Sequence, residues 1–226
     1  MKTKKLIIYG LGETADLAYE YFTHDSDYEV IAFTVDKEYK TNDTHLDLPI
    51  IEFETLETAH PPAEIELFVA SSFNKLNRVR MKMYSAAKTK GYSCASYISS
   101  KAFIWHNATI GENAFILENN VIQHKVKIGN NVILWSGNHI GHQTIIEDNV
   151  SLSSHCVISG FCVIGANSFL GVNCTFNDQI KLGKDNFVGS GALIVKNTED
   201  GKLMIGAPAK PSAVSTYDFF KIPSPQ

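Results

Sequence analysis

Two histidines stand three residues apart in the stretch "GNHIGH", at His139 and His142, and Asn138 directly precedes the first of them. The unperturbed pKa of histidine is about 6.5, so a neutral imidazole can accept a proton near neutral pH. Such a group suits a general base that assists the attack of an amine or a hydroxyl on an acyl carbon. Which of the two side chains could act in this way depends on where each one points.

A repeat of six residues sets these directions. Every sixth position from Ile104 to Ile194 is Ile, Leu, Val or Phe, and a mostly small residue stands two positions before each. A period of six does not fit an α-helix and is typical of a hexapeptide β-helix, in which three hexads form one triangular coil. We therefore predict that the aliphatic residues and the small residues before them fill the interior of a prism.

The repeat gives the two histidines different places. Ile140 is an inward position, so His142, two residues later, is predicted at or just after a corner and outside the prism. His139 precedes Ile140 and is predicted to point outward from the flat strand. His106 and His124 share the hexad position of His142 on the two preceding coils, and we expect them to be structural or interfacial.

The first 98 residues follow another pattern. Apolar, β-branched runs at 5–10, 29–35, 66–72 and 92–98 predict strands, and the segments 13–22 and 74–91 predict helices. This order implies a parallel sheet with helices packed against it.

The turn "GLGETA" joins the first strand to the first helix, which is the setting that a phosphate-binding turn requires. Gly10 and Gly12 lie in this turn, and Asp36 ends the next strand. From the residues alone, the spacing permits two interpretations: a weak NAD fingerprint or a tight turn without a ligand.

Composition limits the classes of function. The chain has 226 residues, 44% hydrophobic residues and a formal net charge of -4, so nothing indicates general attraction to nucleic acid or to an anionic membrane. The apolar run near the start is too short for a signal peptide core, and no stretch of transmembrane length follows. Four cysteines without a secretion signal indicate free thiols. We expect a cytoplasmic protein.

The chain as a whole resembles a known family. The turn "IIYGLGETA", the hexads and the segment "IGAPAKP" together are similar to the left-handed β-helix sugar O-/N-acyltransferases, a group that includes bacillosamine-pathway and sialic-acid acetyltransferases. The resemblance implies three parts. Residues 1–98 would form a Rossmann-like α/β domain with a parallel sheet that binds the nucleotide sugar, residues 99–213 a left-handed parallel β-helix acyltransferase domain, and residues 214–226 a C-terminal tail. The exposed flat faces of the prism, and a base at a corner without a groove of its own, predict a homotrimer with its active sites between subunits.

The resemblance implies an activity as well. We expect an acetyl-CoA-dependent N-acetyltransferase that acts on a nucleotide-linked amino sugar for surface polysaccharide or glycan synthesis, with His142 as general base and no metal. The alternatives are a sugar O-acetyltransferase and a non-catalytic β-helix scaffold. A zinc site of His124, His139 and His142, as in γ-class carbonic anhydrases, would leave the N-terminal half without a function.

Site residues follow from the same resemblance. Substrate contacts are expected from Gly10, Gly12, Asp36, Lys37, Asn74, Arg78, Asn138 and His139. Contacts to coenzyme A are expected from Gly160, Val172, Ser190, Lys196 and Lys210.

The sequence departs from the family in two places. An acidic residue often stands beside the base in this family, but here the neighbours of His142 are Gly141 and Gln143. Another carboxylate would have to orient the base, and the backbone N–H of Gly160 is the predicted oxyanion donor. In the N-terminal turn, Glu13 and Thr14 replace the family's Gly-His pair. The candidate orienting residues are Glu147, Asp148 and Asp178.

Overall fold

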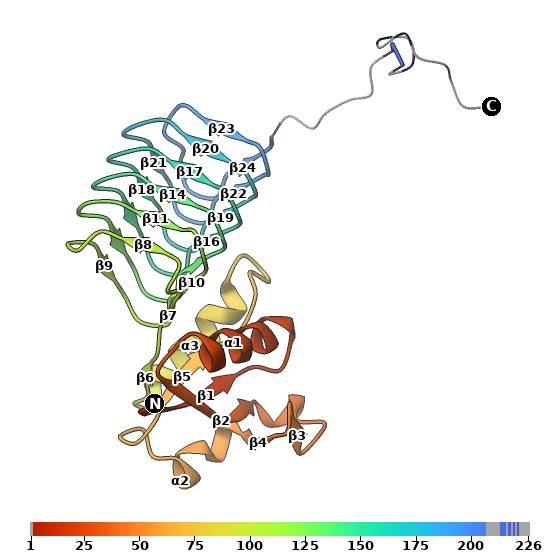
Figure 1. Ribbon diagram of the computed structural model, residues 1–226, viewed down its shortest axis with the longest axis vertical. Coiled ribbons are helices and arrows are strands. Elements are labelled where there is room, and N and C mark those ends of the chain that lie inside the picture. The colour runs from red at the N-terminus through yellow and green to blue at the C-terminus, as the bar shows by residue number, and fades with distance from the viewer. Residues whose placement is uncertain (1, 207–212, 216, 218, 220, 222–226) are drawn as a thin grey trace.

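The computed structural model describes residues 2–206, 213–215, 217, 219 and 221. An α/β domain and a three-sided prism of stacked coils lie one above the other along the long axis (Figure 1). This arrangement confirms the predicted fold class, a Rossmann-like domain with a parallel sheet followed by a left-handed parallel β-helix.

The α/β domain is built on one sheet with the strand order β3-β4-β2-β1-β5-β6, and all its pairs are parallel except β3 with β4. Its strands are β1 (Lys4–Tyr9), β2 (Tyr28–Val35), β3 (Thr44–His45), β4 (Leu48–Glu52), β5 (Glu66–Val69) and β6 (Ser93–Cys94). Its helices are α1 (Glu13–His24), α2 (Leu56–Ala59) and α3 (Arg78–Thr89), with 3-10 turns η1 (Lys37–Tyr39) and η2 (Phe53–Thr55).

Two predicted elements differ from the structure. The helix predicted over 74–91 begins only at Arg78, because Lys75, Leu76 and Asn77 have φ angles of 51°, 53° and 62°, outside the helical region. The single strand predicted over 92–98 is divided between two sheets. Its first part is β6 of the α/β domain, and its second part, β7 (Tyr97–Ile98), pairs with the prism.

The prism has three parallel faces. The docking face comprises β7, β10 (Phe115–Ile116), β13 (Ile133–Leu134), β16 (Ser151–Leu152), β19 (Phe169–Leu170), β22 (Phe187–Val188) and β24 (Leu203–Met204). The histidine face comprises β8 (Phe103–Ile104), β11 (Val121–Ile122), β14 (His139–Ile140), β17 (Val157–Ile158), β20 (Thr175–Phe176) and β23 (Leu193–Ile194). The third face comprises β9 (Thr109–Ile110), β12 (Lys127–Ile128), β15 (Ile145–Ile146), β18 (Val163–Ile164) and β21 (Lys181–Leu182).

The hexads fill the prism as predicted. The aliphatic positions from Ile116 to Ile194 are buried, and Ile104 and Ile110 are partly buried in the first coil. The third residue after an inward position lies within the turn that follows and has a positive φ angle, as at Asn113 and Asp185. Asparagine and aspartate tolerate this left-handed conformation better than most residues, which explains their frequency there.

The α/β domain packs against the docking face. Phe115 and Ile133 of that face belong to the same buried cluster as Phe22 of α1 and Phe68 of β5. The two parts therefore share a core, and the domain limits of 98 and 213 stay predictions. Among the residues that the structure describes, no helix is long and apolar enough to cross a membrane.

Candidate functional site

The turn after β1 is shaped by Gly10. Its φ angle of 138° lies outside the range that L-residues readily adopt, and a Cβ atom there would overlap the carbonyl oxygen of Ala70. The chain then enters α1 through Gly12, the N-cap, which has no side-chain capping bond and no neighbour near its missing Cβ. The amide end of α1 thus faces open space, as anion binding requires.

A cavity of about 920 Å³, here called the α/β pocket, lies at this turn. Five of the predicted substrate residues line it: Gly10, Gly12, Asp36, Asn74 and Arg78.

Lys37 does not line the α/β pocket. Its Nζ lies 3.7 Å from Glu52 Oε2 on the exposed surface, and its backbone N–H donates to Glu54. Lys37 is the first residue of the 3-10 turn η1, and its contact with the nucleotide stays a prediction.

Seven polar residues that the sequence interpretation missed also line the α/β pocket: Tyr9, Glu38, Tyr39, Ser71, Ser72, Lys75 and Lys82. The Tyr9 hydroxyl donates to Asp36, and burial followed by the neighbouring carboxylate raises the pKa of Tyr9. Lys82 follows Arg78 by one turn of α3, and this helical spacing was a usable signal. The pocket wall formed by the start of α3 is therefore basic.

The two histidines lie where the hexads placed them. His139 is half-buried on β14, between Val121 and Val157 of the neighbouring strands. His142 is exposed in the next turn. That turn belongs to the histidine corner, which comprises the turns 105–108, 123–126, 141–144, 159–162 and 177–180.

The neighbours of His142 come from the coils on either side. Its ring lies against Gly160 one coil further on and packs edge-on to Phe161, with ring centroids 4.9 Å apart. Its backbone N–H donates to Gln123 Oε1 at 2.9 Å. A groove of about 300 Å³ beside the imidazole has a mostly apolar lining of Phe103, Trp105, Val121, Gln123, His124 and His142. The imidazole thus stands beside a cleft that a second molecule can enter.

None of the candidate orienting carboxylates bonds to His142. Asp178 accepts the N–H of Gly160 at 2.8 Å, so that N–H is not free for an oxyanion in this arrangement. Asp148 accepts the N–H of Asn130 at 2.7 Å, and Glu147 accepts the N–H of Ala166 at 2.9 Å, both at a different corner. All three carboxylates cap backbone amides of neighbouring coils, which corrects the expectation that one of them orients the base.

Asn138 is a structural residue in this chain. It is 1% exposed, its Nδ2 donates to the carbonyl of Trp135, and its Oδ1 accepts the N–H of Cys156 at 2.8 Å. Both ends of the amide are used inside the corner in this structure, which indicates a structural role, and the contact of Asn138 with substrate stays an untested prediction.

The predicted coenzyme residues lie at two different corners. Gly160 is in the histidine corner, whereas Val172 and Ser190 are in the serine corner, which comprises the turns 99–102, 117–120, 135–138, 153–156, 171–174 and 189–192. These corners flank the histidine face on opposite sides. Lys196 is exposed after β23, and Lys210 lies outside the described residues.

A smaller apolar cavity of about 260 Å³ joins the α/β domain to the serine corner. Thr14 and Ser72 line both this cavity and the α/β pocket, so the two spaces are neighbours. Trp135 and Val172 form part of its wall. We call it the junction cavity.

The residues described contain no cluster of three His, Cys, Asp or Glu side chains arranged to hold a metal ion. His124, a member of the considered zinc set, has its Nδ1 at 3.2 Å from the amide of Asn107. The structure therefore offers no support for the zinc interpretation.

Comparisons with known proteins agree with this architecture. A family model described as bacterial transferase hexapeptide (six repeats) matches residues 107–142 and 125–160. A search of curated proteins found no match.

Solved structures match almost the whole chain. The acetyltransferase domain of PglB from Neisseria gonorrhoeae has a TM-score of 0.80 and 25% identity, and the match covers 93% of this chain and 100% of that one. Perosamine N-acetyltransferase from Caulobacter crescentus, as a histidine-to-asparagine mutant with CoA and GDP-perosamine, has a TM-score of 0.79 and 24% identity over 91% and 95%. WeeI from Acinetobacter baumannii has a TM-score of 0.73 and 20% identity over 92% and 99%.

These matches include the turn after β1 as well as the hexads, which is the combination on which the predicted resemblance rests. The chain carries bacterial transferase hexapeptide repeats, and over both of its domains it is similar in fold to left-handed β-helix acetyltransferases such as the acetyltransferase domain of PglB.

Proposed function

We propose that the protein transfers the acetyl group of acetyl-CoA to the amino group of a nucleotide-linked amino sugar. The observation that carries this proposal is the match of both domains, over 91% of the chain, to a perosamine N-acetyltransferase that holds CoA and GDP-perosamine. A cytoplasmic location and a role in surface polysaccharide or glycan synthesis are part of the proposal, since they fit this class of substrate.

The α/β pocket supports the nucleotide part of the proposal. Lys75, Arg78 and Lys82 supply positive charge for a diphosphate, and the open N-terminus of α1 supplies backbone N–H groups. Asp36 supplies a carboxylate that can accept hydrogen bonds from sugar hydroxyls. The adjoining junction cavity, lined by Ser72 among others, is the space into which the acceptor sugar would extend.

His142 is proposed as the general base. The amine nitrogen attacks the thioester carbonyl carbon and forms a C–N bond, and the imidazole takes the proton that the nitrogen loses. The tetrahedral intermediate then expels the thiolate, which receives the proton and leaves as free coenzyme A. A thioester is already activated, so the buried cysteines Cys156, Cys162 and Cys174 need no role as nucleophiles.

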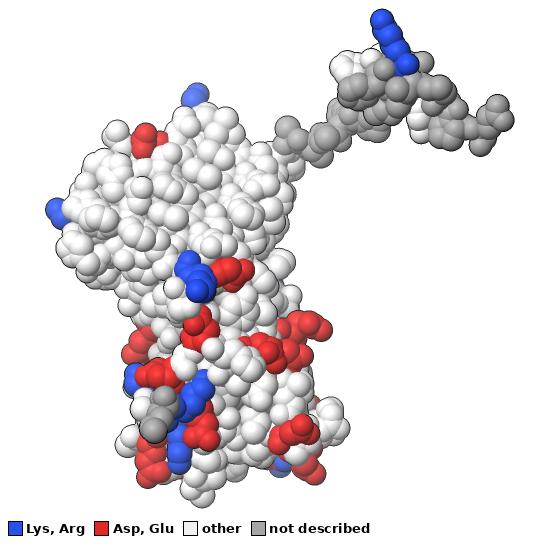
Figure 2. Space-filling view, viewed as in Figure 1, with Lys and Arg blue, Asp and Glu red and all other residues white. Residues whose placement is uncertain are grey.

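A second copy of the chain is needed to complete this site. The α/β domain packs on the docking face, whereas His142 lies at the corner between the other two faces. The α/β pocket and the junction cavity are not lined by His142, and the groove beside His142 is not lined by residues of the α/β domain. The outward positions of the histidine face carry no charge, and Phe103, Val157 and Leu193 are 52%, 41% and 61% exposed. Charged residues gather over the α/β domain, whereas the prism shows few in the view of Figure 2.

We therefore propose a homotrimer in which the histidine face of one prism meets a neighbouring subunit. This packing would bring the serine corner of one chain, with Val172 and Ser190, toward Gly160 and His142 of the next. The predicted coenzyme residues would then line one groove.

The test is an assay of the purified full chain with acetyl-CoA and GDP-, UDP- and dTDP-linked amino sugars, with thiol release and product mass as readouts. N-acetylation gives a gain of one acetyl group that resists alkaline hydroxylamine. An O-acetyl ester would be cleaved by the same treatment and would favour the sugar O-acetyltransferase. No turnover with any amino sugar would favour the non-catalytic scaffold.

A further inference from the structure

A ladder of side chains runs along one edge of the prism, at the ladder corner, which comprises the turns 111–114, 129–132, 147–150, 165–168 and 183–186. Each amide Nδ2 donates to the Oδ1 of the next rung, at 2.7, 2.8, 3.2 and 3.0 Å in order. All five rungs have φ angles between 54° and 62°. The rungs are Asn113, Asn131, Asn149, Asn167 and Asp185.

The last rung differs from the others in charge. The turn requires a residue that tolerates the left-handed conformation, and asparagine meets that need at four rungs. The backbone gives no reason for a carboxylate at Asp185. A stability role is also a weak reason, because partly exposed ion pairs contribute little to folding.

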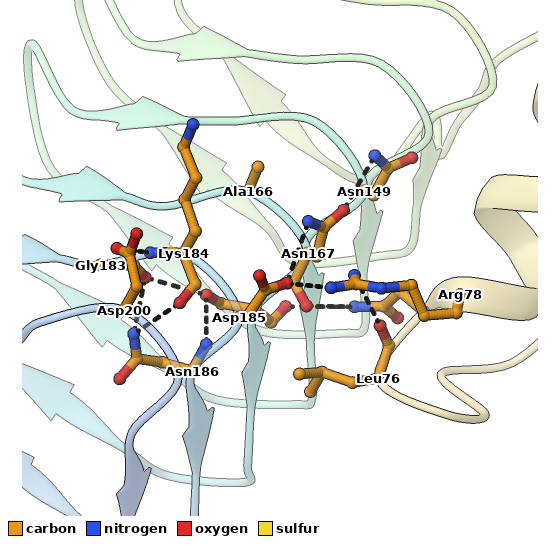
Figure 3. A network of polar contacts seen from close by, with 12 residues as sticks. Leu76, Arg78, Asn149, Ala166, Asn167, Gly183, Lys184, Asp185, Asn186 and Asp200 are labelled. Atoms are coloured by element: carbon orange, nitrogen blue, oxygen red, sulfur yellow. Dashed lines mark hydrogen bonds and ion pairs between the residues drawn. The ribbon is translucent and has the colours of Figure 1, made fainter.

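The carboxylate of Asp185 accepts hydrogen bonds both from the prism and from the α/β domain. One oxygen, Oδ1, accepts from Asn167 Nδ2 and from Nη2 of Arg78, at the start of α3 (Figure 3). Its hydrogen bond with Arg78 is the main cause that lowers the pKa of Asp185. Asp185, the rung with a carboxylate, is therefore also the rung that contacts Arg78 of the α/β domain.

The N-terminal end of α3 has a second contact with the prism, through Asn77. Asn77 donates to the carbonyls of Asn167 and Ser168 at 3.2 and 3.3 Å, and its Oδ1 accepts from the Ser151 hydroxyl at 2.8 Å. The basic wall of the α/β pocket is formed by this segment. The ladder thus fixes the position of the wall relative to the prism.

We propose that Asp185 is a positioning residue of the α/β pocket, which holds the Arg78 guanidinium so that its remaining N–H groups face the diphosphate of a nucleotide. This inference rests on the proposed function of that pocket. A guanidinium has five N–H donors. One is used by Asp185 and another reaches the Leu76 carbonyl at 3.4 Å, which leaves donors for a phosphate.

Two effects of the Asp185 charge oppose each other. A free arginine side chain loses rotamer freedom when it binds an anion, and a partner that already restrains it removes that cost. The carboxylate also repels a diphosphate. When the charge is removed, weaker nucleotide binding shows that the restraint of Arg78 is the larger effect, and tighter binding shows that the repulsion is larger.

The test uses the full chain and the variant Asp185→Asn. This change gives the fifth rung the residue of the other four, so the left-handed turn and the acceptor for Asn167 are kept. Asp200→Asn is the matched control, since Asp200 is an exposed acid whose Oδ1 accepts the N–H of Lys184 at 2.8 Å. It loses the same charge near the same corner but has no bond to Arg78.

Binding of GDP, UDP and dTDP is measured by calorimetry. We expect Asp185→Asn to weaken the Kd of the tightest nucleotide by about fivefold, a size typical of the loss of one restrained charged contact, and Asp200→Asn to leave it unchanged. The KM for the nucleotide sugar should rise with little change in kcat. In an Arg78→Ala background, Asp185→Asn should have no further effect, because it acts through Arg78.

Each other outcome overturns the inference. Unchanged or tighter binding by Asp185→Asn would show that the charge does not position Arg78 for the ligand. An equal loss in the Arg78→Ala background would show that Asp185 acts by another route. If the wild type itself binds none of the three nucleotides and turns over no nucleotide sugar, the proposed function fails first and the inference fails with it.

Discussion

The ring of His142 occupies the space in which any residue other than glycine at position 160 would place its Cβ atom. A Cβ built on Gly160 would lie 2.6 Å from Cε1 and 2.9 Å from Nε2 of His142. Phe161, the next residue, packs edge-on against the same ring. The next coil therefore sets the orientation of the imidazole. Gly160 leaves the space that the ring occupies, and Phe161 packs against the ring.

Gly160→Ala should displace this ring. Because the conflicting atoms belong to a side chain that can rotate, the protein should fold with little loss of stability, while kcat falls by about 10-fold or more through misplacement of the base. Steady-state kinetics and thermal unfolding measure the two effects separately.

Gly165→Ala is the matched control on the same coil. Its Cβ would lie 2.5 Å from the backbone carbon of Gly183, which cannot rotate away, and it does not approach His142. We expect lower stability and a nearly unchanged kcat. If the two variants lose activity and stability in parallel, the contact with His142 has no special importance.

His142→Ala should lower kcat by about 10² to 10⁴, the usual contribution of a general base. Because the side chain is exposed, folding should be unaffected. The residual rate should recover in part at high pH, where the sugar amine loses its proton without help. His139→Ala should cost much less in kcat, and the opposite ranking of the two variants would assign the base to His139.

Val157→Glu should disrupt the trimer. Val157 is 41% exposed in the middle of the histidine face, next to His139, and a buried unpaired carboxylate there would be costly. Sedimentation at micromolar concentration should show monomers, and acetyl transfer should be lost. Val163→Glu on the third face is the control and should stay trimeric. A fully active monomer of the wild type would contradict both the trimer and the shared site.

The Arg78–Asp185 pair should make stability depend on acid pH. The pKa of Asp185 is lowered in the folded state, chiefly by its hydrogen bond with Arg78. Its contribution is therefore present above the unfolded pKa, about 3.9, and is lost as the pH falls through the lower folded value. The side chains are 39% and 37% exposed, so the contribution should be at most about 1 kcal/mol. Urea unfolding of Asp185→Asn and wild type should differ at pH 7 and converge near pH 2.

Arg80 should stabilise the contact between the α/β domain and the prism. It is 1% exposed, donates to the carbonyls of Val69 and Asn113, and has no carboxylate bonded to its guanidinium among the described residues. Burial lowers its pKa. Arg80→Ala should cost about 3 to 5 kcal/mol, since it leaves a cavity and removes the guanidinium donor from two buried carbonyls, of which that of Val69 keeps a 3.4 Å bond from Asn113 Nδ2.

Arg80→Met is the companion variant, because it refills most of the volume without the charge. It should be less destabilising than Arg80→Ala in urea unfolding. Equal stability of Arg80→Ala and wild type would show that the two carbonyls find other partners.

The local pattern of the chain was sufficient for the prism and for the direction of single side chains. A period of six is visible along the sequence, and it placed Ile140 inside and His142 outside at a corner. In the first 98 residues, the change from an apolar strand to a helical pattern placed the strand–helix turn at Gly10. The family resemblance proposed Asp36, Asn74 and Arg78 as substrate contacts, and the structure brings them to one cavity. The prism and the strand–helix turn depend on residues close in sequence or related by the repeat.

Only the tertiary structure decided which polar groups have hydrogen-bond partners within the protein and which are free to bind a ligand. Asn138, Asp178 and the N–H of Gly160 have side-chain or backbone partners one coil away, and sequence cannot tell a capping group from a ligand-binding one. The split of 92–98 between two sheets and the contact of Arg78 with Asp185 depend on how the α/β domain packs on the docking face. That packing joins surfaces that no shared period relates, so its contacts exist only once both parts have folded.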